Sequence, residues 1–255
     1  MSVDFKSQLS NLGLNQGDVV LMHSSMNALQ TDKSPIDFIK DIISVISLEG
    51  TLLLPAFTYK YVNAKRPYFK VSETEPGPGI GIISRYFFRM QGVSRSLHPT
   101  HSVCAYGKKA IELTSKHLLD ETPVGFNSPI MRILNYNGKI LFIGDILNTC
   151  TFMHGIEEIV NAPYALAKER TRYIIEDENE NIIEKDMFSH DFNGWEQEYQ
   201  RIKEILKFPE IKKGKIGQAD CFLIDASALF KKASEKFKEN IYYFVTDKRI
   251  SNENR

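Results

Sequence analysis

The sequence has few cysteines and no long apolar run. Its three cysteines, Cys104, Cys150 and Cys221, are scattered, odd in number and without metal-ligand spacing. This argues against a disulfide framework and against a structural zinc site. No run of about 18 apolar residues occurs, so we expect no transmembrane helix. Residues 1–6 lack the basic and apolar blocks of a signal peptide, and we expect a cytoplasmic protein.

The chain also lacks a net charge, because its 32 Lys and Arg residues balance 32 Asp and Glu residues. Composition therefore gives no electrostatic reason to expect a nucleic-acid partner, and we expect no membrane partner. The glycine-rich dinucleotide fingerprint, the phosphate-loop lysine motif and the Gly-x-Ser-x-Gly elbow are missing as well. These absences disfavour hydride transfer, nucleotide hydrolysis and a serine nucleophile of the elbow type.

What the chain does contain is an alternation of strand-like and helix-like segments. Strands are predicted at 18–22, 51–55, 103–106, 139–144 and 219–224, and a β-hairpin at 170–187 with its turn at 177–181. Helices are predicted at 4–13, from Pro35 to before Gly50, and at 81–90, 108–118, 128–134, 151–160, 196–206 and 226–239. No repeat or linker interrupts them. We therefore expect one α/β domain over residues 1–255, an α/β/α layered domain with a central mixed sheet and a β-hairpin extension.

Three polar clusters lie near predicted strands. The segment Arg95–Ser102 holds two histidines, two serines, a threonine, an arginine and a proline between apolar segments. So many polar side chains are not typical of a packed core, so the composition predicts a loop that contributes to a functional site. The second cluster, 148–158, follows the strand at 139–144, and the third, His23-Ser24-Ser25, follows the strand at 18–22. This layout is typical of an α/β enzyme with its site at the strand ends.

His154 and Glu157 stand three residues apart on a predicted helix, so they share a face. A carboxylate beside an imidazole fixes its tautomer and raises its basicity, which a general base near neutral pH requires. The alternative is a histidine near a helix start with a solvated glutamate. The polar run at 148–151 keeps both interpretations open.

Hydroxyls, backbone amides and one guanidinium could together hold an anionic ligand. The candidates are Ser24, Ser25, Arg95, Ser96, Thr100, His101 and Ser102. The alternative for 23–25 is capping of a helix that begins near Ser25. A capped helix N-terminus also favours anions.

A zinc site is a weaker interpretation of the histidines. His98 and His101 are three apart and could form a triad with His154 or Asp145, but Pro99 makes a regular helical pair unfavourable. We therefore predict no metal.

Two other groups carry open alternatives. Cys150 could be a nucleophile, but no basic partner stands at a recognisable spacing. Asp191 could supply a carboxylate for a cationic amine or cap a helix that begins near Gly194, and Asp186 is the other candidate carboxylate.

Taken in order, these clusters resemble the aminoglycoside 3-N-acetyltransferase family. The matching segments are 17–25, 50–58, 92–103, 128–130, 138–144, 148–157 and 216–219. The resemblance covers nearly the whole chain, and the loop at 95–102 and the block at 148–157 are its most specific parts.

The resemblance implies an α/β fold distinct from the common small acetyltransferase fold, with acetyl-coenzyme A as donor and an amino sugar as acceptor. It implies that His154 takes the proton from the attacking amine, that Glu157 orients it and that Asp191 lies near the acceptor. Residues matching the part of the family that holds coenzyme A are His23, Ser24, Ser25, Arg95, Ser96, His98, Thr100, His101 and Ser102.

The chemistry follows from the needs of the amine. An ammonium group is not a nucleophile, so it must lose a proton before or during attack on the thioester, and neutral His154 can accept it. Direct transfer is favoured over an acetyl-cysteine because Cys150 has no evident activation. Backbone amides near Ser24 and Ser25, or the hydroxyl of Thr149 or Thr151, are candidate donors to the oxyanion.

The acceptor has two alternatives. Aminoglycosides are polycations, which suit a carboxylate-rich pocket. The loop at 57–78 instead offers aromatic and basic side chains, which suit a nucleotide-linked amino sugar of a surface polysaccharide pathway. We predict Tyr59, Tyr61, Asn148 and Thr149 as substrate-binding residues. A coenzyme A-binding homologue without catalysis is a third alternative, and the sequence is compatible with a homo-oligomer.

Overall fold

The centre of the molecule is a seven-stranded sheet. The computed structural model describes residues 4–251, with side chains described up to residue 249, and the remaining residues of the domain expected over 1–255 lie outside it. The strand order is β10 (Ile211–Ile216), β11 (Ala219–Asp225), β6 (Lys139–Ile143), β1 (Val19–Ser24), β2 (Thr51–Pro55), β5 (Val103–Gly107) and β4 (Ser94–Arg95). Because β1 pairs in parallel with β2 and β6 while the outer pairs are antiparallel, the predicted mixed sheet is confirmed.

The central strands are apolar because both of their faces are covered. Leu21 of β1 lies opposite Leu53 of β2 and Ile140 of β6, and all three side chains enter one hydrophobic core. Their sequence neighbours Val20, Leu52 and Leu141 enter the second core on the opposite face. The alternation of side chains along a strand thus builds two cores from one sheet.

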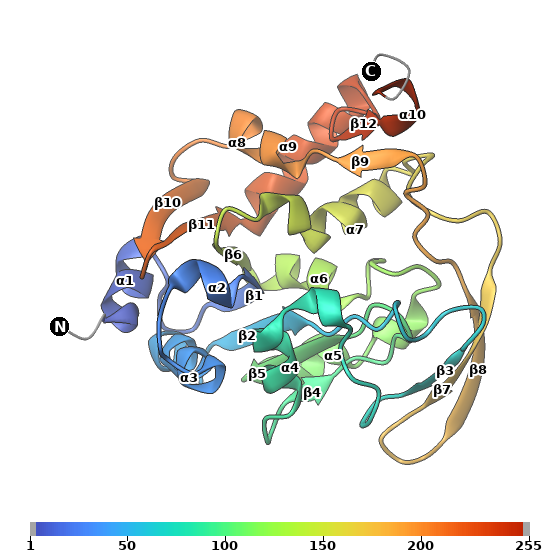
Figure 1. Cartoon of the computed structure of the whole chain (residues 1–255), viewed down its shortest axis with the longest axis horizontal. Helices are drawn as coiled ribbons and strands as arrows, with labels where there is room; N and C mark the ends of the chain where they lie inside the picture. Colours follow the sequence, from blue (N-terminus) through green and yellow to red (C-terminus); the bar gives the residue numbers. More distant parts are fainter. Residues whose placement is uncertain (1–3, 252–255) are drawn as a thin grey trace.

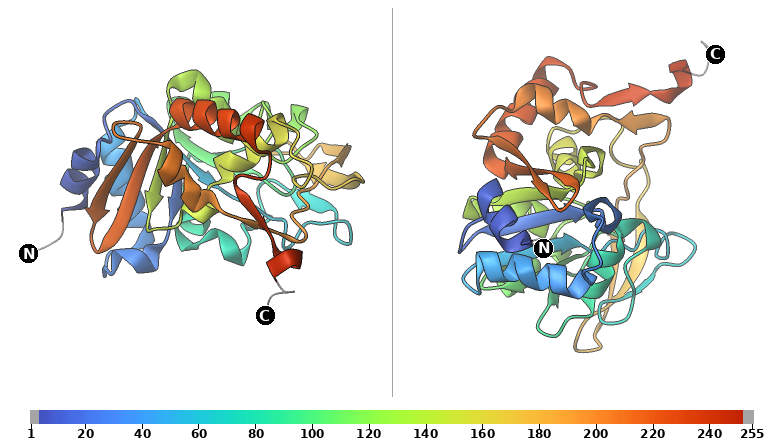
Figure 2. Two further views of the ribbon diagram at one scale, coloured as in Figure 1. Left: turned by 90° about the horizontal axis from the view of Figure 1, so that it is seen from above. Right: turned by 60° about the vertical axis from the view of Figure 1, so that its left-hand side comes forward.

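Helices cover each face of the sheet. On one face lie α5 (Ala110–Thr114), α6 (Pro129–Arg132), α7 (Thr151–Ile159) and α9 (Ala226–Glu239), and on the other α1 (Phe5–Leu12), α3 (Pro35–Ile46) and α4 (Ile82–Phe88). In the right-hand view of Figure 2, α3 lies below the strands and α7 above them. This is the α/β/α layering that the sequence predicts. Within residues 4–251, no helix combines the length and the apolar character needed to span a bilayer.

A second, smaller sheet flanks the first (Figure 1). The predicted hairpin forms as β7 (Thr171–Glu176) and β8 (Ile182–Met187), which pair antiparallel around the expected turn. Asp177 shapes this turn, because its Oδ1 accepts from the backbone amides of Asn179 and Asn181 at 2.8 and 2.9 Å. The loop at 57–78 contributes β3 (Tyr68–Lys70), which lies parallel to β7.

The helix predicted over 196–206 is wrong. Its first residues form β9 (Trp195–Gln197), which pairs with β12 (Val245–Asp247) near the end of the chain. A short 3-10 helix, η5 (Tyr199–Arg201), and α8 (Ile202–Ile205) follow. The remaining short elements are α2 (Met26–Leu29), η1 (Pro78–Ile80), η2 (His117–Leu119), η3 (Ile133–Tyr136), η4 (Leu147–Thr149) and α10 (Lys248–Ser251).

Strand direction brings the three polar clusters to one edge of the sheet. The parallel strands β1 and β6 end in register, with Ser24 opposite Ile143, so the segments that follow them start side by side. β5 runs antiparallel to β2 and begins where β2 ends, with Val103 opposite Pro55. The segment that precedes β5 therefore arrives at the same edge as the segments that follow β1 and β6.

Candidate active site

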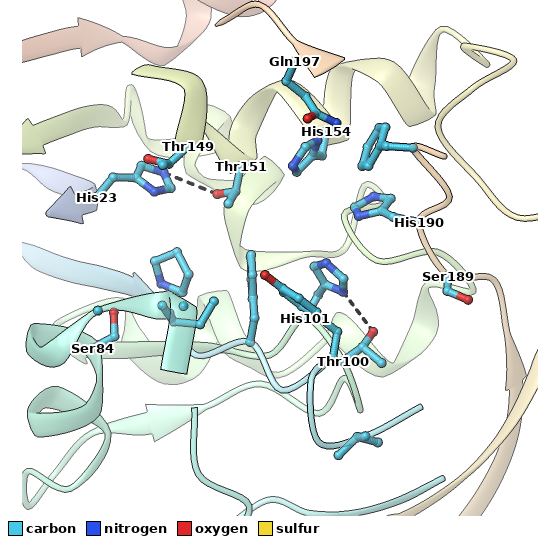
Figure 3. A pocket seen from close by; sticks show the side chains of 18 of the residues that line it. His23, Ser84, Thr100, His101, Thr149, Thr151, His154, Ser189, His190 and Gln197 are labelled. Carbon is cyan, nitrogen blue, oxygen red and sulfur yellow. Dashed lines mark hydrogen bonds between the residues drawn. The ribbon is translucent and has the colours of Figure 1, made fainter. Parts of the chain in front are cut away.

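A cavity of about 790 Å³ opens at this edge of the sheet (Figure 3). Nine of the predicted site residues line it: His23, Ser24, Tyr59, Thr100, His101, Asn148, Thr149, Thr151 and His154. Further lining side chains come from the small sheet and the segment after it, including Tyr173, Ser189, His190 and Phe192. Among the described residues of this wall, none is Asp, Glu, Lys or Arg.

His154 lies in the first turn of α7, and two buried side chains contact Nδ1 of its ring. Its Nδ1 lies 3.1 Å from Oε2 of Glu157, whose side chain is completely buried, while the His154 side chain is 17% exposed. The hydroxyl of Tyr199 lies 2.9 Å from the same Nδ1 and donates to Glu157 Oε2 at 2.8 Å. Tyr164 donates to the other carboxylate oxygen. These contacts occupy Nδ1 and leave Nε2 as the ring nitrogen able to accept a proton.

Tyr199 supports this arrangement as a donor. Burial, together with the neighbouring Glu157 carboxylate, raises the pKa of Tyr199 well above its usual value. The phenol therefore stays protonated and donates a hydrogen bond to Glu157. The carboxylate then fixes the His154 tautomer in which Nδ1 carries the hydrogen.

Two further imidazoles lie near His154. The ring centroid of His190 is 4.9 Å from that of His154 and 4.7 Å from that of His101. Burial is the main cause that lowers the pKa of His101 and His190 well below the usual value, so both rings are neutral at pH 7. His101 Nδ1 is 2.9 Å from the hydroxyl of Thr100.

The end of β1 forms the opposite wall. His23 stacks on Phe142 at 5.0 Å and is 6% exposed, and burial lowers its pKa to about 3. Its Nε2 lies 3.4 Å from the hydroxyl of Thr151, which is the first residue of α7 (Figure 3). Ser24 follows His23 in the wall.

Candidate oxyanion donors differ in their availability. The backbone amide of Ser25 donates to the Ile143 carbonyl, and the hydroxyl of Thr149 donates to the Ile146 carbonyl at 2.7 Å. Both hydrogens are thus already used. Among the described side chains and backbone, the hydroxyl of Thr151 has only the long contact to His23, which leaves it as the best-placed candidate.

Arg95 is not brought to the cavity. Its guanidinium is buried and donates to the backbone carbonyls of Val71, Thr74 and Ala56 at 3.0, 2.6 and 3.1 Å. Its Nε donates to the hydroxyl of Ser102 at 2.9 Å. Arg95 therefore ties three segments of backbone together.

The neighbours of Arg95 also face inward. The hydroxyl of Ser96 pairs with Nδ1 of His117 at 2.8 Å, and that of Ser102 donates to the Ala56 carbonyl. His98 is completely buried, and its Nδ1 accepts from the backbone amide of His101 at 3.0 Å. These side chains hold the shape of the loop that presents Thr100 and His101 to the cavity.

Several other predicted residues lie outside the cavity wall. Ser25 occupies the N-cap position of α2 but makes no side-chain cap bond. Tyr61 is 41% exposed, and Asp191 is exposed with its carboxylate accepting from the backbone amide of Asn193. Asp186 lies on β8, 3.6 Å from Arg172. His154 and Glu157 are thus in contact, whereas neither Asp186 nor Asp191 lines the cavity.

Local sequence patterns do not identify Tyr199, Tyr164, His190 or Glu158 as site residues. Tyr199 lies 42 residues from Glu157, and no local pattern links them. The sequence contains one indication for His190, because it is adjacent to Asp191 in a polar segment, but Asp191 is the residue predicted to be functional.

Cysteine and metal chemistry find no support in the described part of the chain. Burial raises the pKa of Cys150 to about 12, so its side chain is a thiol at neutral pH. Between residues 4 and 251, no group of three or more His, Cys, Asp or Glu side chains is arranged to hold a metal ion.

Comparison with known proteins identifies a family and two relatives. The model of a family described as aminoglycoside 3-N-acetyltransferase matches residues 21–238. Aminoglycoside N(3)-acetyltransferase IX of Micromonospora chalcea is 26% identical over 88% of this chain and 89% of its own length. The SPbeta prophage-derived aminoglycoside N(3')-acetyltransferase-like protein YokD of Bacillus subtilis is 24% identical over 91% of this chain and 90% of its own length.

Solved structures share the fold. A mutant of aminoglycoside acetyltransferase AAC(3)-IVa in complex with a gentamicin aligns with a TM-score of 0.81 and 23% identity, covering 94% of this chain and 89% of that one. The binary complex of AAC-IIIb with CoASH aligns with a TM-score of 0.79 and 21% identity, covering 92% and 95%. These likenesses confirm the predicted fold, distinct from the common small acetyltransferase fold.

Proposed function

The chain belongs to the aminoglycoside 3-N-acetyltransferase family, and we propose that it acetylates a primary amine of an amino sugar by direct transfer with His154 as general base. It is an N-acetyltransferase, and acetyl-coenzyme A is its acetyl donor. The observation that carries the proposed mechanism is the position of His154. Its ring lines the cavity while its Nδ1 is held by a completely buried carboxylate.

In the proposed reaction, Nε2 of His154 takes a proton from the amine as nitrogen attacks the thioester carbon. The carbon–sulfur bond of the tetrahedral intermediate then breaks, and the thiolate of coenzyme A takes the proton back from the imidazolium. Glu157 and Tyr199 keep the ring oriented throughout, since both contact Nδ1. General base catalysis of this kind typically contributes about 10²–10⁴-fold.

We propose Thr151 as the donor to the developing oxyanion. Its hydroxyl comes from the first residue of α7, in the same wall as His154. A lost donor of this kind typically raises the barrier by about 3 kcal/mol. Direct transfer is supported by the state of Cys150, because a buried thiol with a raised pKa is a poor nucleophile.

His154→Ala is the decisive variant. In a thiol-release assay with acetyl-coenzyme A and a panel of primary amines, we expect turnover to fall at least about 100-fold. Calorimetry should give an unchanged affinity for coenzyme A. Glu178→Gln, on the exposed hairpin turn, serves as the matched control and should behave as wild type. Unaffected turnover in His154→Ala removes this residue from the role of base.

The cavity also favours a second candidate acceptor. A polycation requires carboxylates around it, whereas the described residues of this wall include none. Tyr59 from the loop at 57–78 lies in the wall, where it stacks on His101 at 5.6 Å. We therefore propose an amino sugar with fewer cationic groups as the alternative to an aminoglycoside. A nucleotide-linked amino sugar is one such acceptor, and its diphosphate would have to lie outside this wall, which contains no Lys or Arg among the described residues.

A comparison of kcat/KM separates the acceptors. A higher kcat/KM for a nucleotide-linked amino sugar than for gentamicin supports the alternative, and robust turnover of gentamicin alone excludes it. Binding of acetyl-coenzyme A without turnover of any amine would instead support the non-catalytic homologue.

A further inference from the structure

A second buried pair of imidazole and carboxylate stands beside the first. Nε2 of His190 lies 2.7 Å from Oε1 of Glu158, with side-chain exposures of 9% and 4%. Glu158 is the residue after Glu157 on α7, so the two carboxylates leave the same helix in different directions. His190 lines the cavity, and in Figure 3 its ring lies between those of His154 and His101.

The surroundings of this pair come from several elements. The rings of His101, His154 and Phe192 face His190 with centroids at 4.7, 4.9 and 5.0 Å. Both oxygens of Glu158 accept from the backbone amide of Val124, at 2.9 and 3.1 Å. The hydroxyl of Thr122 also bonds this carboxylate, and the carboxylate of Asp120 lies close enough to interact with it.

These surroundings make the pair a proton acceptor near neutral pH. Burial raises the pKa of Glu158 to about 7, and burial lowers that of His190. Above pH 7 the pair therefore consists of a carboxylate and a neutral imidazole. With Nε2–H donated to Glu158, the lone pair of Nδ1 is the site that can receive a proton.

The reaction creates a need for a second acceptor. An amino sugar nitrogen enters as –NH3⁺ and ends as an amide with one N–H, so it gives up two protons. The coenzyme A thiolate takes one of them, and the other must reach water. A neutral imidazole has one free lone pair and can accept only one additional proton at a time.

We propose that His190, held by Glu158, takes the first proton from the bound ammonium and leaves His154 to take the second during attack. This inference rests on the proposed function. The first transfer converts –NH3⁺ into –NH2 and protonates His190 at Nδ1, and Nε2–H can then pass to Glu158. Next the nitrogen–carbon bond forms and the carbon–sulfur bond breaks. His154 returns its proton to the thiolate, and the pair of His190 and Glu158 releases its proton to water.

The test compares two acceptors of similar shape. One is a primary amine that wild type acetylates, which is an ammonium at pH 7, and the other is its aminooxy analogue, which is neutral at that pH. His190→Gln keeps an amide that can donate to Glu158 but accepts no proton. We expect it to lower kcat/KM for the amine about 100-fold at pH 7 and to change that for the aminooxy compound less than about threefold. The deficit with the amine should shrink as the pH approaches the pKa of the amine.

Matched variants give the controls. His154→Gln should lower kcat/KM for both acceptors, because both must lose a proton during attack. Glu158→Gln should reproduce the selective loss of His190→Gln, and it replaces that variant if circular dichroism finds His190→Gln unfolded.

Equal losses for the two acceptors, or a deficit that does not change with pH, overturn the proposal. If wild type does not use the aminooxy compound, the pH profile of the amine decides alone. Absence of wild-type turnover with every amine would contradict the proposed function itself, which is a different result.

Discussion

The guanidinium of Arg95 is buried and hydrogen-bonded to backbone carbonyls and one serine hydroxyl of the same protein. Three of its hydrogen bonds reach backbone carbonyls, those of Ala56, Val71 and Thr74, and a fourth reaches Ser102. Burial lowers the pKa of Arg95 to about 10, so the group remains charged at pH 7. The carbonyls are its hydrogen-bond partners, and loss of the donors would leave buried acceptors unsatisfied.

Arg95→Met should therefore destabilise the fold without weakening coenzyme A binding. Each buried carbonyl left without a donor costs about 1–3 kcal/mol, so we expect the free energy of unfolding to fall by about 3 kcal/mol or more. Urea denaturation measures this loss, and calorimetry should give a coenzyme A affinity within about twofold of wild type. Arg95→Lys, which keeps the charge but not the fork of donors, should lose less. Normal stability with weakened affinity would instead assign Arg95 to the ligand.

Local spacing predicts some site residues and not others. His154 and Glu157 could be found from sequence because residues three apart on a helix share a face. Tyr199 and His190 reach the same place through the fold, 45 and 36 residues further along the chain. The polar composition of the loop at 95–102 does not distinguish a side chain that faces a ligand from one that satisfies buried backbone. Which of the two roles a side chain has depends on where unpaired backbone carbonyls lie in the folded chain, and the sequence does not show this.

At the scale of elements, the position of His154 depends on how closely α7 approaches α6. A Cβ on Gly155 would lie 2.2 Å from Sδ of Met131 and 3.0 Å from Cγ1 of Val124. Glycine thus permits a helix contact that no other residue fits without movement. Because Gly155 directly follows His154, movement of α7 at this point moves the proposed base as well.

Gly155→Ala should overpack this contact and displace α7. We expect the free energy of unfolding to fall by about 1–3 kcal/mol, and turnover to fall more than coenzyme A affinity. Met131→Ala provides the space for a methyl group, although alone it should also destabilise the chain. A double-mutant cycle by urea denaturation should therefore find a smaller effect of Gly155→Ala in the Met131→Ala background. Additive effects would show that the two residues do not compete for space.

The predictability of elements follows their place in the sheet. The buried strands β1, β2 and β6 are continuous apolar runs, which the sequence reveals directly. The edge strand β10 contains Lys212, Lys213 and Gly214, a composition that suits a half-exposed edge but resembles a loop. β9 forms only because a distant segment, β12, pairs with it, and helical spacing alone could not reveal that partner.

At the scale of the whole molecule, the histidines gather around one edge of the sheet. Five of the six have a pKa lowered mainly by burial: His23, His98, His101, His117 and His190. The folded chain thus excludes protons that the unfolded chain binds near pH 6.5. The proposed mechanism requires neutral imidazoles in this cavity, and the same burial makes the fold sensitive to acid.

Stability should therefore fall as the pH drops from 7.5 to 5.5. The stability from a histidine with a lowered pKa is fully present above the unfolded value of 6.5 and is lost as the pH falls towards the folded value. His23 and His117, whose pKa is about 3 in the folded chain, each cost about 1 kcal/mol at pH 5.5, and His98, His101 and His190 act in the same direction. Glu158 acts in the opposite direction. Its raised pKa of about 7 stabilises the fold at low pH, and this stability is lost as the pH rises through about 7. On acidification to pH 5.5 it therefore offsets about 2 kcal/mol of the loss from the histidines.

Five histidines lose stability on acidification and one glutamate gains it, so the midpoint of urea denaturation should drop as the pH falls from 7.5 to 5.5. His117→Gln tests the assignment with a group outside the cavity wall. The pKa of His117 is about 3 because of burial, and its partners are Ser96 and the Pro123 carbonyl. The variant should be less stable than wild type at pH 7.5, but its loss of stability on acidification should be smaller by about 1 kcal/mol. A midpoint that stays constant from pH 7.5 to 5.5 would mean that the buried histidines take up protons without unfolding.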